Sequence, residues 1–148
     1  MKLVTRILSC LLLLGTLSIA GDPKELATAH ALLKKAAAAI KADKASALKQ
    51  IGDPKGPFVE GEVYVFAYDL TGTMLAHPTN PRLVGKNLVE TPDVDGKLFR
   101  KEIVEGANAK GSGTVDYRYK NPESGKIEDK TTHYLKVNDV ILACGVYR

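Results

Sequence analysis

One long segment without glycine or proline constrains this chain more than any other feature of its sequence. Residues 24–50 are rich in Ala, Leu and Lys, and their apolar members recur at steps of three and four, the spacing of one helix face. Asp22-Pro23-Lys24-Glu25 supplies an acidic N-cap, a proline at the first helical position and a glutamate at the third. The pattern predicts one amphipathic helix of roughly 27 residues, about 40 Å long, which the glycines and prolines of residues 52–57 end. Its buried face is expected to contain Leu26, Ala29, Leu33, Ala36, Ile40, Ala47 and Ile51.

The sequence after this helix predicts a β-rich region. Residues 62–69 alternate strictly, which places successive side chains on opposite faces of a strand. Further strands are expected at residues 73–77, 114–120, 126–137 and 140–147. A short second helix is expected to contain Phe99, Ile103, Val104 and Ala107. A helix, a hairpin, a short helix and a three-stranded meander define the α+β class, with one domain over residues 21–148 and a sheet of about five antiparallel strands.

The first twenty residues have the pattern of a secretory signal. Lys2 and Arg6 precede an apolar stretch at residues 7–20, which ends with Ser18-Ile19-Ala20, small enough at the right places for signal peptidase. As a helix this stretch would cover roughly 21 Å, less than a hydrocarbon core of about 30 Å. We expect cleavage near Gly21, a periplasmic or secreted domain, and no stable membrane insertion afterwards. The alternative is an uncleaved anchor, whereas Cys10 lies too early in the apolar stretch for a lipoprotein.

Cleavage also changes the charge and the cysteine count. Lys+Arg falls from 21 to 19 against 17 Asp+Glu, which lowers the net charge from +4 to +2. No Lys/Arg cluster interleaved with aromatic residues is present, so we expect no nucleic-acid partner. Cys144 remains as the single cysteine and lies in the apolar residues 140–144, which predicts a buried, unreactive thiol.

The motifs of common enzymes are missing from the sequence. It contains no Gly-x-Ser-x-Gly elbow, P-loop, dinucleotide fingerprint or His-Glu-x-x-His. Residues 93–96 resemble a fragment of a calcium loop but lack its bidentate glutamate. His30, His77 and His133 have no second metal-type ligand at a spacing of two to four residues. We therefore expect no metal, no cofactor and no catalytic residue; an enzyme would need His77 or His133 beside a tyrosine hydroxyl.

Aromatic residues on predicted strand faces suggest a ligand pocket instead. Tyr64, Phe66 and Tyr68 share one face of their strand, and the aliphatic residues Val63, Val65 and Ala67 share the other. Val115, Tyr117 and Tyr119 likewise share a face of a later strand. Tyrosine hydroxyls in an apolar wall suit a small polar ligand, and Lys130 and His133 could recognise a carboxylate. Ordinary aromatic core packing is the alternative.

Several segments in the same order resemble the single Cache domains of type 2. Residues 64–78, YVFAYDLTGTMLAHP, resemble the first hairpin of that family. They are followed by LVGKN at 83–87, DGK at 95–97, GSGTVDY at 111–117, NP at 121–122, KTT at 130–132 and GVY at 145–147. The resemblance covers roughly residues 24–148. It implies a PAS-like fold, with the long helix packed across an antiparallel sheet, and an extracytoplasmic sensor of small molecules such as short-chain carboxylates.

The resemblance also implies where the ligand binds. The pocket is expected on the sheet face away from the long helix, where relatives often have a tyrosine in place of His133. The ligand-binding candidates are Tyr64, Phe66, Tyr68, His77, Tyr117, Tyr119, Lys130 and His133. Family members are commonly embedded in receptors or sensor kinases, so we expect this chain to act with a separate membrane receptor or kinase. A structural or interaction module with a pocket filled by its own side chains is the alternative function.

Overall fold

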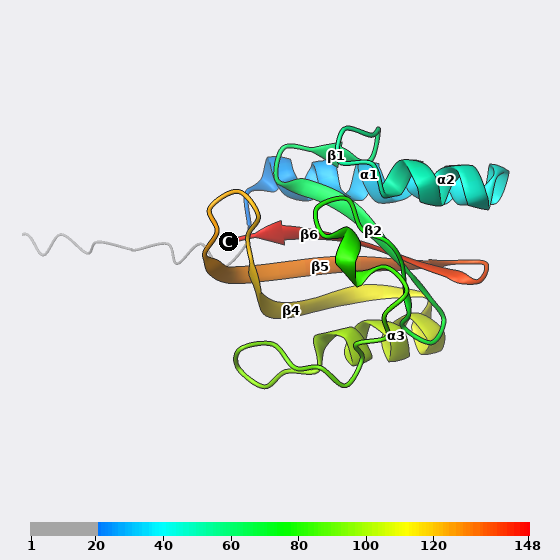
Figure 1. Cartoon of the computed structure of the whole chain (residues 1–148). Helices are drawn as coiled ribbons and strands as arrows, with labels where there is room; N and C mark the ends of the chain where they lie inside the picture. Colours follow the sequence, from blue (N-terminus) through cyan, green and yellow to red (C-terminus); the bar gives the residue numbers. More distant parts are fainter. Residues whose placement is uncertain (1–20) are drawn as a thin grey trace, which may run out of the picture.

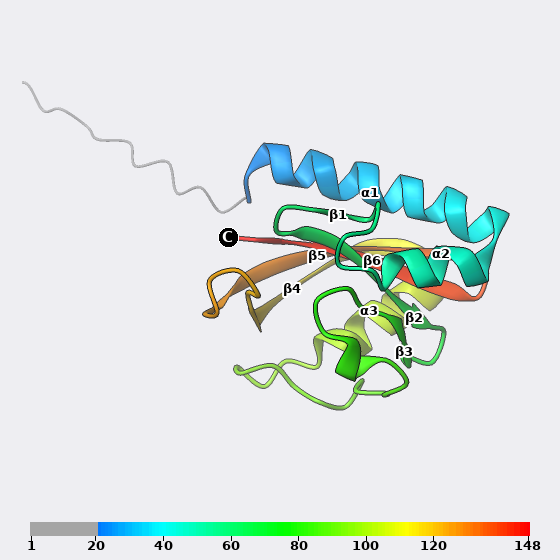
Figure 2. The same ribbon diagram turned by 45° about the horizontal axis from the view of Figure 1, so that its top comes forward.

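A single antiparallel sheet lies between two layers of helix and loop (Figure 1). The computed structural model describes residues 21–148, and the expected signal segment, residues 1–20, lies outside the described residues. Helices α1 (Pro23–Ala42) and α2 (Lys44–Ile51) cover one face of the sheet. Helix α3 (Phe99–Lys110) covers the other face, together with the loop that precedes it (Figure 2). The predicted PAS-like α+β arrangement is confirmed.

The sheet has six strands, and the C-terminal strand lies near its centre. The strands are β1 (Val59–Glu60), β2 (Val63–Asp69), β3 (Met74–Ala76), β4 (Ser112–Lys120), β5 (Ile127–Val137) and β6 (Val140–Tyr147). Their order is β1-β2-β6-β5-β4, with β3 paired to β2 and every pair antiparallel. The two-residue β1 is the strand that the sequence did not reveal. A 3-10 turn, η1 (Pro81–Leu83), follows β3.

The prediction of one continuous N-terminal helix is wrong at Asp43. This residue is extended, with φ −155° and ψ 97°, and it separates α1 from α2. Its backbone N–H donates to the Ala39 carbonyl at 2.9 Å, and its carboxylate accepts the Ser46 N–H at 3.1 Å. One aspartate therefore ends the first helix and caps the second. Asp competes for backbone groups in this way, so it can interrupt a helix without glycine or proline.

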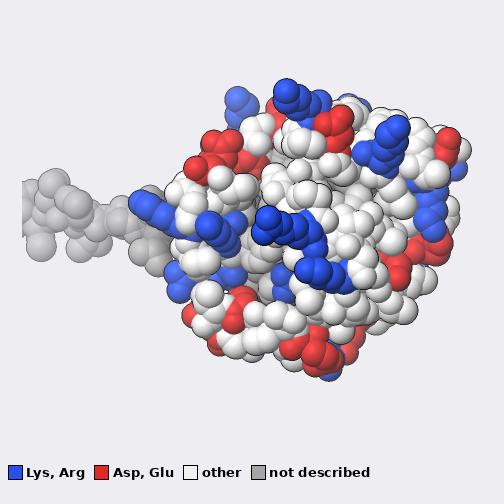
Figure 3. Space-filling model, in the orientation of Figure 1, with Lys and Arg blue, Asp and Glu red and all other residues white. Residues whose placement is uncertain are grey.

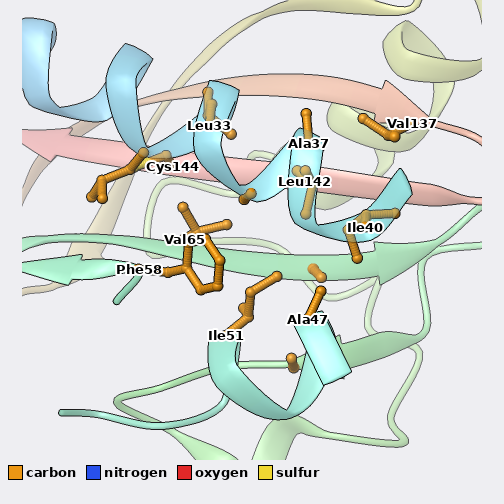
Figure 4. Close-up of a cluster of buried hydrophobic side chains, with 14 of the residues drawn as sticks. Leu33, Ala37, Ile40, Ala47, Ile51, Phe58, Val65, Val137, Leu142 and Cys144 are labelled. Atoms are coloured by element: carbon orange, nitrogen blue, oxygen red, sulfur yellow. The ribbon is translucent and has the colours of Figure 1, made fainter. Parts of the chain in front are cut away.

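The core beneath α1 and α2 is mainly aliphatic, with one aromatic ring, Phe58 (Figure 4). Leu33 and Ile40 of α1 belong to the same buried cluster as Val65 of β2, and Ile51 of α2 completes it. The predicted alternation along β2 is confirmed, because Val63, Val65 and Ala67 face this cluster while Tyr64, Phe66 and Tyr68 face the other. Burying one such aliphatic side chain contributes about 1.5–3 kcal/mol. This layer therefore fixes the position of the sheet against the helices.

Cys144 lies within this aliphatic core and is a free thiol with no exposed surface. The prediction of a buried cysteine is confirmed. Burial raises the pKa of the thiol to about 12. The reactive thiolate is therefore scarce at neutral pH in the folded protein.

Surface charges are mixed rather than gathered in one patch on the face seen in Figure 3. Lys97 lies 3.4 Å from Glu102, and Lys101 lies 3.0 Å from Glu90, both on or beside α3. Such exposed pairs contribute little to stability. Among the described residues, no helix is both long and apolar enough to cross a membrane.

Candidate functional site

Two cavities adjoin on the sheet face covered by α3. The inner one has a volume of about 10 Å³ and is enclosed by aromatic rings and Lys130, which leaves room for about one water molecule. The outer one is an open groove of about 690 Å³. Both are lined by Tyr64, His77, Phe99, Arg100 and Tyr119. These five residues, called the dividing wall here, separate Lys130 from the groove.

Lys130 is the most unusual residue of the inner cavity, because its side chain is charged and only 1% of it is exposed. Its Nζ donates to the hydroxyl of Tyr64 at 3.0 Å and to that of Tyr147 at 3.3 Å. The same nitrogen lies 4.5 Å and 4.4 Å from the centroids of these two rings, within range of a cation–π interaction. The ammonium group is therefore held by neutral partners.

Gly145 allows Lys130 to reach this position. The lysine stem lies across β6, where a Cβ on Gly145 would be 2.2 Å from Lys130 Cε and 2.6 Å from Thr132 Oγ1. Gly145 pairs with Tyr64 on one side and with Thr132 on the other. Because Gly145 on β6 has no side chain, the Lys130 side chain can pass over β6 from β5 and place its ammonium group next to Tyr64 on β2.

Arg100 is a second buried cation, with 6% exposure, that the sequence analysis missed. Its guanidinium lies 4.3 Å from the centroid of the Phe99 ring, and its Nη1 donates to the Thr91 carbonyl at 3.3 Å. Within residues 21–148, neither Lys130 nor Arg100 forms an ion pair with a carboxylate. The sequence did contain evidence that Arg100 is buried. Arg100 lies three and four positions before Ile103 and Val104, on the apolar face of the predicted helix.

Two groups in the cavity respond to this positive charge. Burial tends to raise the pKa of Tyr64, but the adjacent Lys130 ammonium, together with hydrogen bonds to the Tyr64 hydroxyl, outweighs burial and lowers the pKa. Burial, reinforced by Lys130 and Arg100, lowers the pKa of His77 to about 3. His77 Nδ1 accepts the Asn80 backbone N–H at 3.1 Å. The ring is therefore neutral, with its proton on Nε2, which can act as a donor.

Tyr117 has a supporting position behind these donors. Its ring stacks on Phe99 with the centroids 3.8 Å apart, and its hydroxyl is 2.9 Å from Thr132 Oγ1. Burial raises the pKa of Tyr117. Because its hydroxyl is already paired, Tyr117 contributes packing and the placement of Phe99 to the cavity.

The structure brings seven of the eight candidates together around the inner cavity: Tyr64, Phe66, Tyr68, His77, Tyr117, Tyr119 and Lys130. His133 is not among them. It lies on the opposite face of the sheet, with Nδ1 3.3 Å from Nε2 of His30 on α1. Lys130 and His133 are three residues apart on one strand, and an odd separation puts side chains on opposite faces. Besides Arg100, the sequence analysis missed Phe99 and Tyr147.

The chemical character of the site follows from this inventory. Two cations, a neutral histidine and tyrosine hydroxyls line the inner cavity and its wall, and the remaining lining is aromatic or aliphatic. Among the described residues, no group of three or more His, Cys, Asp or Glu could hold a metal ion. An antiparallel PAS-like sheet with such a cavity on the face opposite its N-terminal helix defines a sensory ligand-binding domain.

The chain belongs to the single Cache domain 2 family, whose model matches residues 24–148. Domains of this family are extracytoplasmic sensors that bind ligands. Among solved structures, a periplasmic sensor domain of a chemotaxis protein is 29% identical, with a TM-score of 0.67, and the match covers 84% of this chain and 92% of that one. A Cache chemosensory domain solved to explain carboxylic acid recognition is 31% identical, with a TM-score of 0.63 and 84% of each chain covered.

Curated relatives contain this domain as a small part of a longer protein. The chain is 30% identical over 86 residues to the sensor histidine kinase MctS of Rhizobium johnstonii, which is 57% of this chain and 18% of the kinase. It is 33% identical over 86 residues to the methyl-accepting chemotaxis protein McpP of Pseudomonas putida, which is 57% of this chain and 16% of the receptor. The matches thus span less than a fifth of the length of these relatives.

Proposed function

We propose that this domain binds a small organic carboxylate outside the cytoplasm and reports its presence to a membrane receptor or kinase. The observation that carries the proposal is Lys130, a buried ammonium with hydroxyl and aromatic partners and no carboxylate partner among the described residues. The carboxylic acid recognised by a structural relative supports the same ligand class.

The cost of burying charge explains why an anion suits this cavity. Moving an ammonium group out of water is costly unless it is paired. Tyr64 and Tyr147 return part of this cost through hydrogen bonds, and a carboxylate would return more through charge-assisted bonds. His77 Nε2–H and the Arg100 guanidinium could donate to the second oxygen after a rearrangement of the dividing wall. No acidic group among the described lining residues of the inner cavity opposes an anion.

A second function, a structural module with a self-filled pocket, is favoured by the cavity volume. About 10 Å³ is too small for acetate, and Tyr64 and Tyr147 already accept two hydrogen bonds from Lys130. The two functions differ in one measurable respect. A sensor must open the dividing wall for its ligand, whereas a structural module gains nothing from added carboxylates.

The experiment is a thermal-shift screen with acetate, propionate, lactate, pyruvate and amino acids at millimolar concentration. A ligand at 100 times its Kd adds about 2.7 kcal/mol to the free energy of unfolding, a shift of several degrees in a domain of this size. Lys130→Met should abolish the shift because it keeps the stem and removes the charge. Lys136→Met is the matched control, since Lys136 lies on the same strand and its Nζ contacts Asn108 Oδ1 at the surface.

The hydroxyl contribution is tested separately with Tyr64→Phe. We expect a loss of about 1.5–3 kcal/mol in binding if Tyr64 donates to the bound anion, roughly a tenfold to hundredfold higher Kd. Absence of a shift with every compound would contradict the carboxylate proposal and favour the structural module. A shift that persists in Lys130→Met would place the ligand elsewhere.

Export is part of the same proposal. We expect the protein isolated from its native host to begin near Gly21 and to reside in the periplasm or the medium. Mass spectrometry of the intact protein measures the first residue directly. A chain that retains Met1 in the membrane fraction would instead favour an anchored sensor.

A further inference from the structure

The two histidines far apart in the sequence form a pair on the face opposite Lys130. His30 lies on α1 and His133 on β5, and their rings meet edge to face with centroids 4.7 Å apart. The facing atoms, His30 Nε2 and His133 Nδ1, are 3.3 Å apart. Two nitrogen ligands of a tetrahedral metal, each at about 2.0–2.1 Å from it, lie about 3.3–3.4 Å from one another. The facing nitrogens therefore already have the separation that a shared metal requires.

We propose that His30 and His133 bind one divalent transition-metal ion of the Zn²⁺ and Cu²⁺ class, bridging α1 and β5. This site is independent of the proposed carboxylate function, because it uses the other face of the sheet and none of the residues around Lys130. Neutral imidazole is a preferred ligand of these ions, and water completes their coordination.

The surroundings leave space for that water. The pair lies in an open groove of about 650 Å³ between α1 and the β4–β5 edge of the sheet. His133 also lines an adjoining cavity of about 240 Å³. His30 is exposed and His133 is half-buried, so an ion reaches the two nitrogens without unfolding of α1.

Charges of both signs lie near the pair. Asp116 lies close enough to His133 to favour positive charge beside it. Lys34 and Lys41 line the same groove and oppose a cation.

Proton balance at the site is simple. In the metal-free pair one facing nitrogen carries the proton of the hydrogen bond and the other accepts it. Metal binding requires both facing nitrogens to be unprotonated, so that proton moves to the other nitrogen of its own ring through solvent. This change of tautomer releases no proton by itself.

Other soft ligands within residues 21–148 are poor competitors. His77 is buried, and its Nδ1 accepts the Asn80 N–H. Cys144 is fully buried, and burial raises the pKa of its thiol to about 12. The His30–His133 pair is therefore where an added ion should bind first.

Titration calorimetry and thermal shift on the untagged full chain test the proposal, with Cu²⁺, Zn²⁺ and, as a hard-ion control, Mg²⁺. We expect one Cu²⁺ or Zn²⁺ per chain, Cu²⁺ the tighter, a higher melting temperature with either, and no response to Mg²⁺. His30→Gln and His133→Gln should each weaken binding at least about tenfold, since even outer-shell partners of metal ligands cost that much. Lys34→Gln, which lines the groove without a ligand atom, should bind as well as the native chain or better.

Paramagnetic resonance of the Cu²⁺ complex provides a signature specific to the pair. Coupling to two imidazole nitrogens is expected in the native chain, and to one in either glutamine variant. The proposal is overturned if no 1:1 binding occurs, or if either ion binds both glutamine variants with unchanged affinity.

Discussion

Substituting Gly145 by alanine should displace the Lys130 side chain while leaving its hydrogen-bond partners, Tyr64 and Tyr147, unchanged. The new Cβ would lie 2.2 Å from Lys130 Cε and 2.6 Å from Thr132 Oγ1. Neither distance is tolerated, so both side chains must shift, and the flexible lysine stem moves more easily than the buried Thr132, whose Oγ1 pairs with the Tyr117 hydroxyl. Nζ would then lose its bonds to Tyr64 and Tyr147.

The expected magnitude follows from two opposing effects. Losing hydrogen bonds of a buried charge costs about 1.5–3 kcal/mol, whereas replacing a strand glycine with alanine returns about 0.5–1 kcal/mol. Gly145→Ala should therefore lower the free energy of unfolding by about 1–2 kcal/mol, a fall of roughly 4–8 °C in Tm for a chain of this length. Gly52→Ala is the control, because its Cβ would meet its neighbours at an ordinary 3.6 Å.

Denaturant unfolding of Gly145→Ala, Lys130→Ala and the double variant measures the coupling. If the lysine stem is the obstacle, the double variant should lose clearly less stability than the sum of the single variants. Effects that add to within about 0.5 kcal/mol would refute the reasoning. A carboxylate-induced thermal shift in Gly145→Ala as large as in the native chain would refute the link to ligand binding.

Three further outcomes are expected. Leu33→Asp should lower the free energy of unfolding by at least about 3 kcal/mol because it buries an unpaired charge among aliphatic side chains, whereas the exposed Lys34→Asp should change it by less than about 0.5 kcal/mol; equal melting temperatures would contradict the packing of α1. His77 has a pKa of about 3 in the folded protein, against 6.5 for the ordinary group, so it binds more protons when unfolded. Its contribution to the free energy of unfolding is therefore present above pH 6.5 and lost as the pH falls towards 3. If His77→Gln leaves the pH dependence of the free energy of unfolding unchanged, this reasoning is wrong. Cys144 should react with a thiol reagent only at the rate of unfolding, and rapid labelling of the folded protein would show that β6 opens.

Periodic features were predictable from the sequence because burial imposes them directly. The strict alternation of β2 identified both faces of the strand, and the three-to-four spacing identified the buried face of α1. The aromatic face of β2 also led to Tyr64. These inferences need only the geometry of one element, whereas Lys130 was singled out because its ammonium group could recognise a carboxylate.

Features that depend on two elements were beyond that reasoning. Asp43 interrupts the helix because its carboxylate accepts a hydrogen bond from the Ser46 N–H. The free energy of this interrupted arrangement differs little from that of a continuous helix. The approach of His30 to His133 results from the packing of α1 on β5, and no local spacing encodes it. Arg100 is a different case: its position on an apolar helix face was visible, as was the odd spacing of Lys130 and His133, and both signals were overlooked.

The dividing wall has a kinetic consequence. Because the inner cavity holds no more than about one water molecule, a ligand that binds beside Lys130, as proposed, could enter only during the fraction of time in which the dividing wall is open. The apparent Kd then equals the intrinsic value divided by that fraction, and the observed association rate levels off at high ligand concentration at the rate of opening. Substitutions that loosen the start of α3 would speed both the entry and the escape of the ligand. The response time of such a sensor would thus be set by the motion of the protein rather than by diffusion of the ligand.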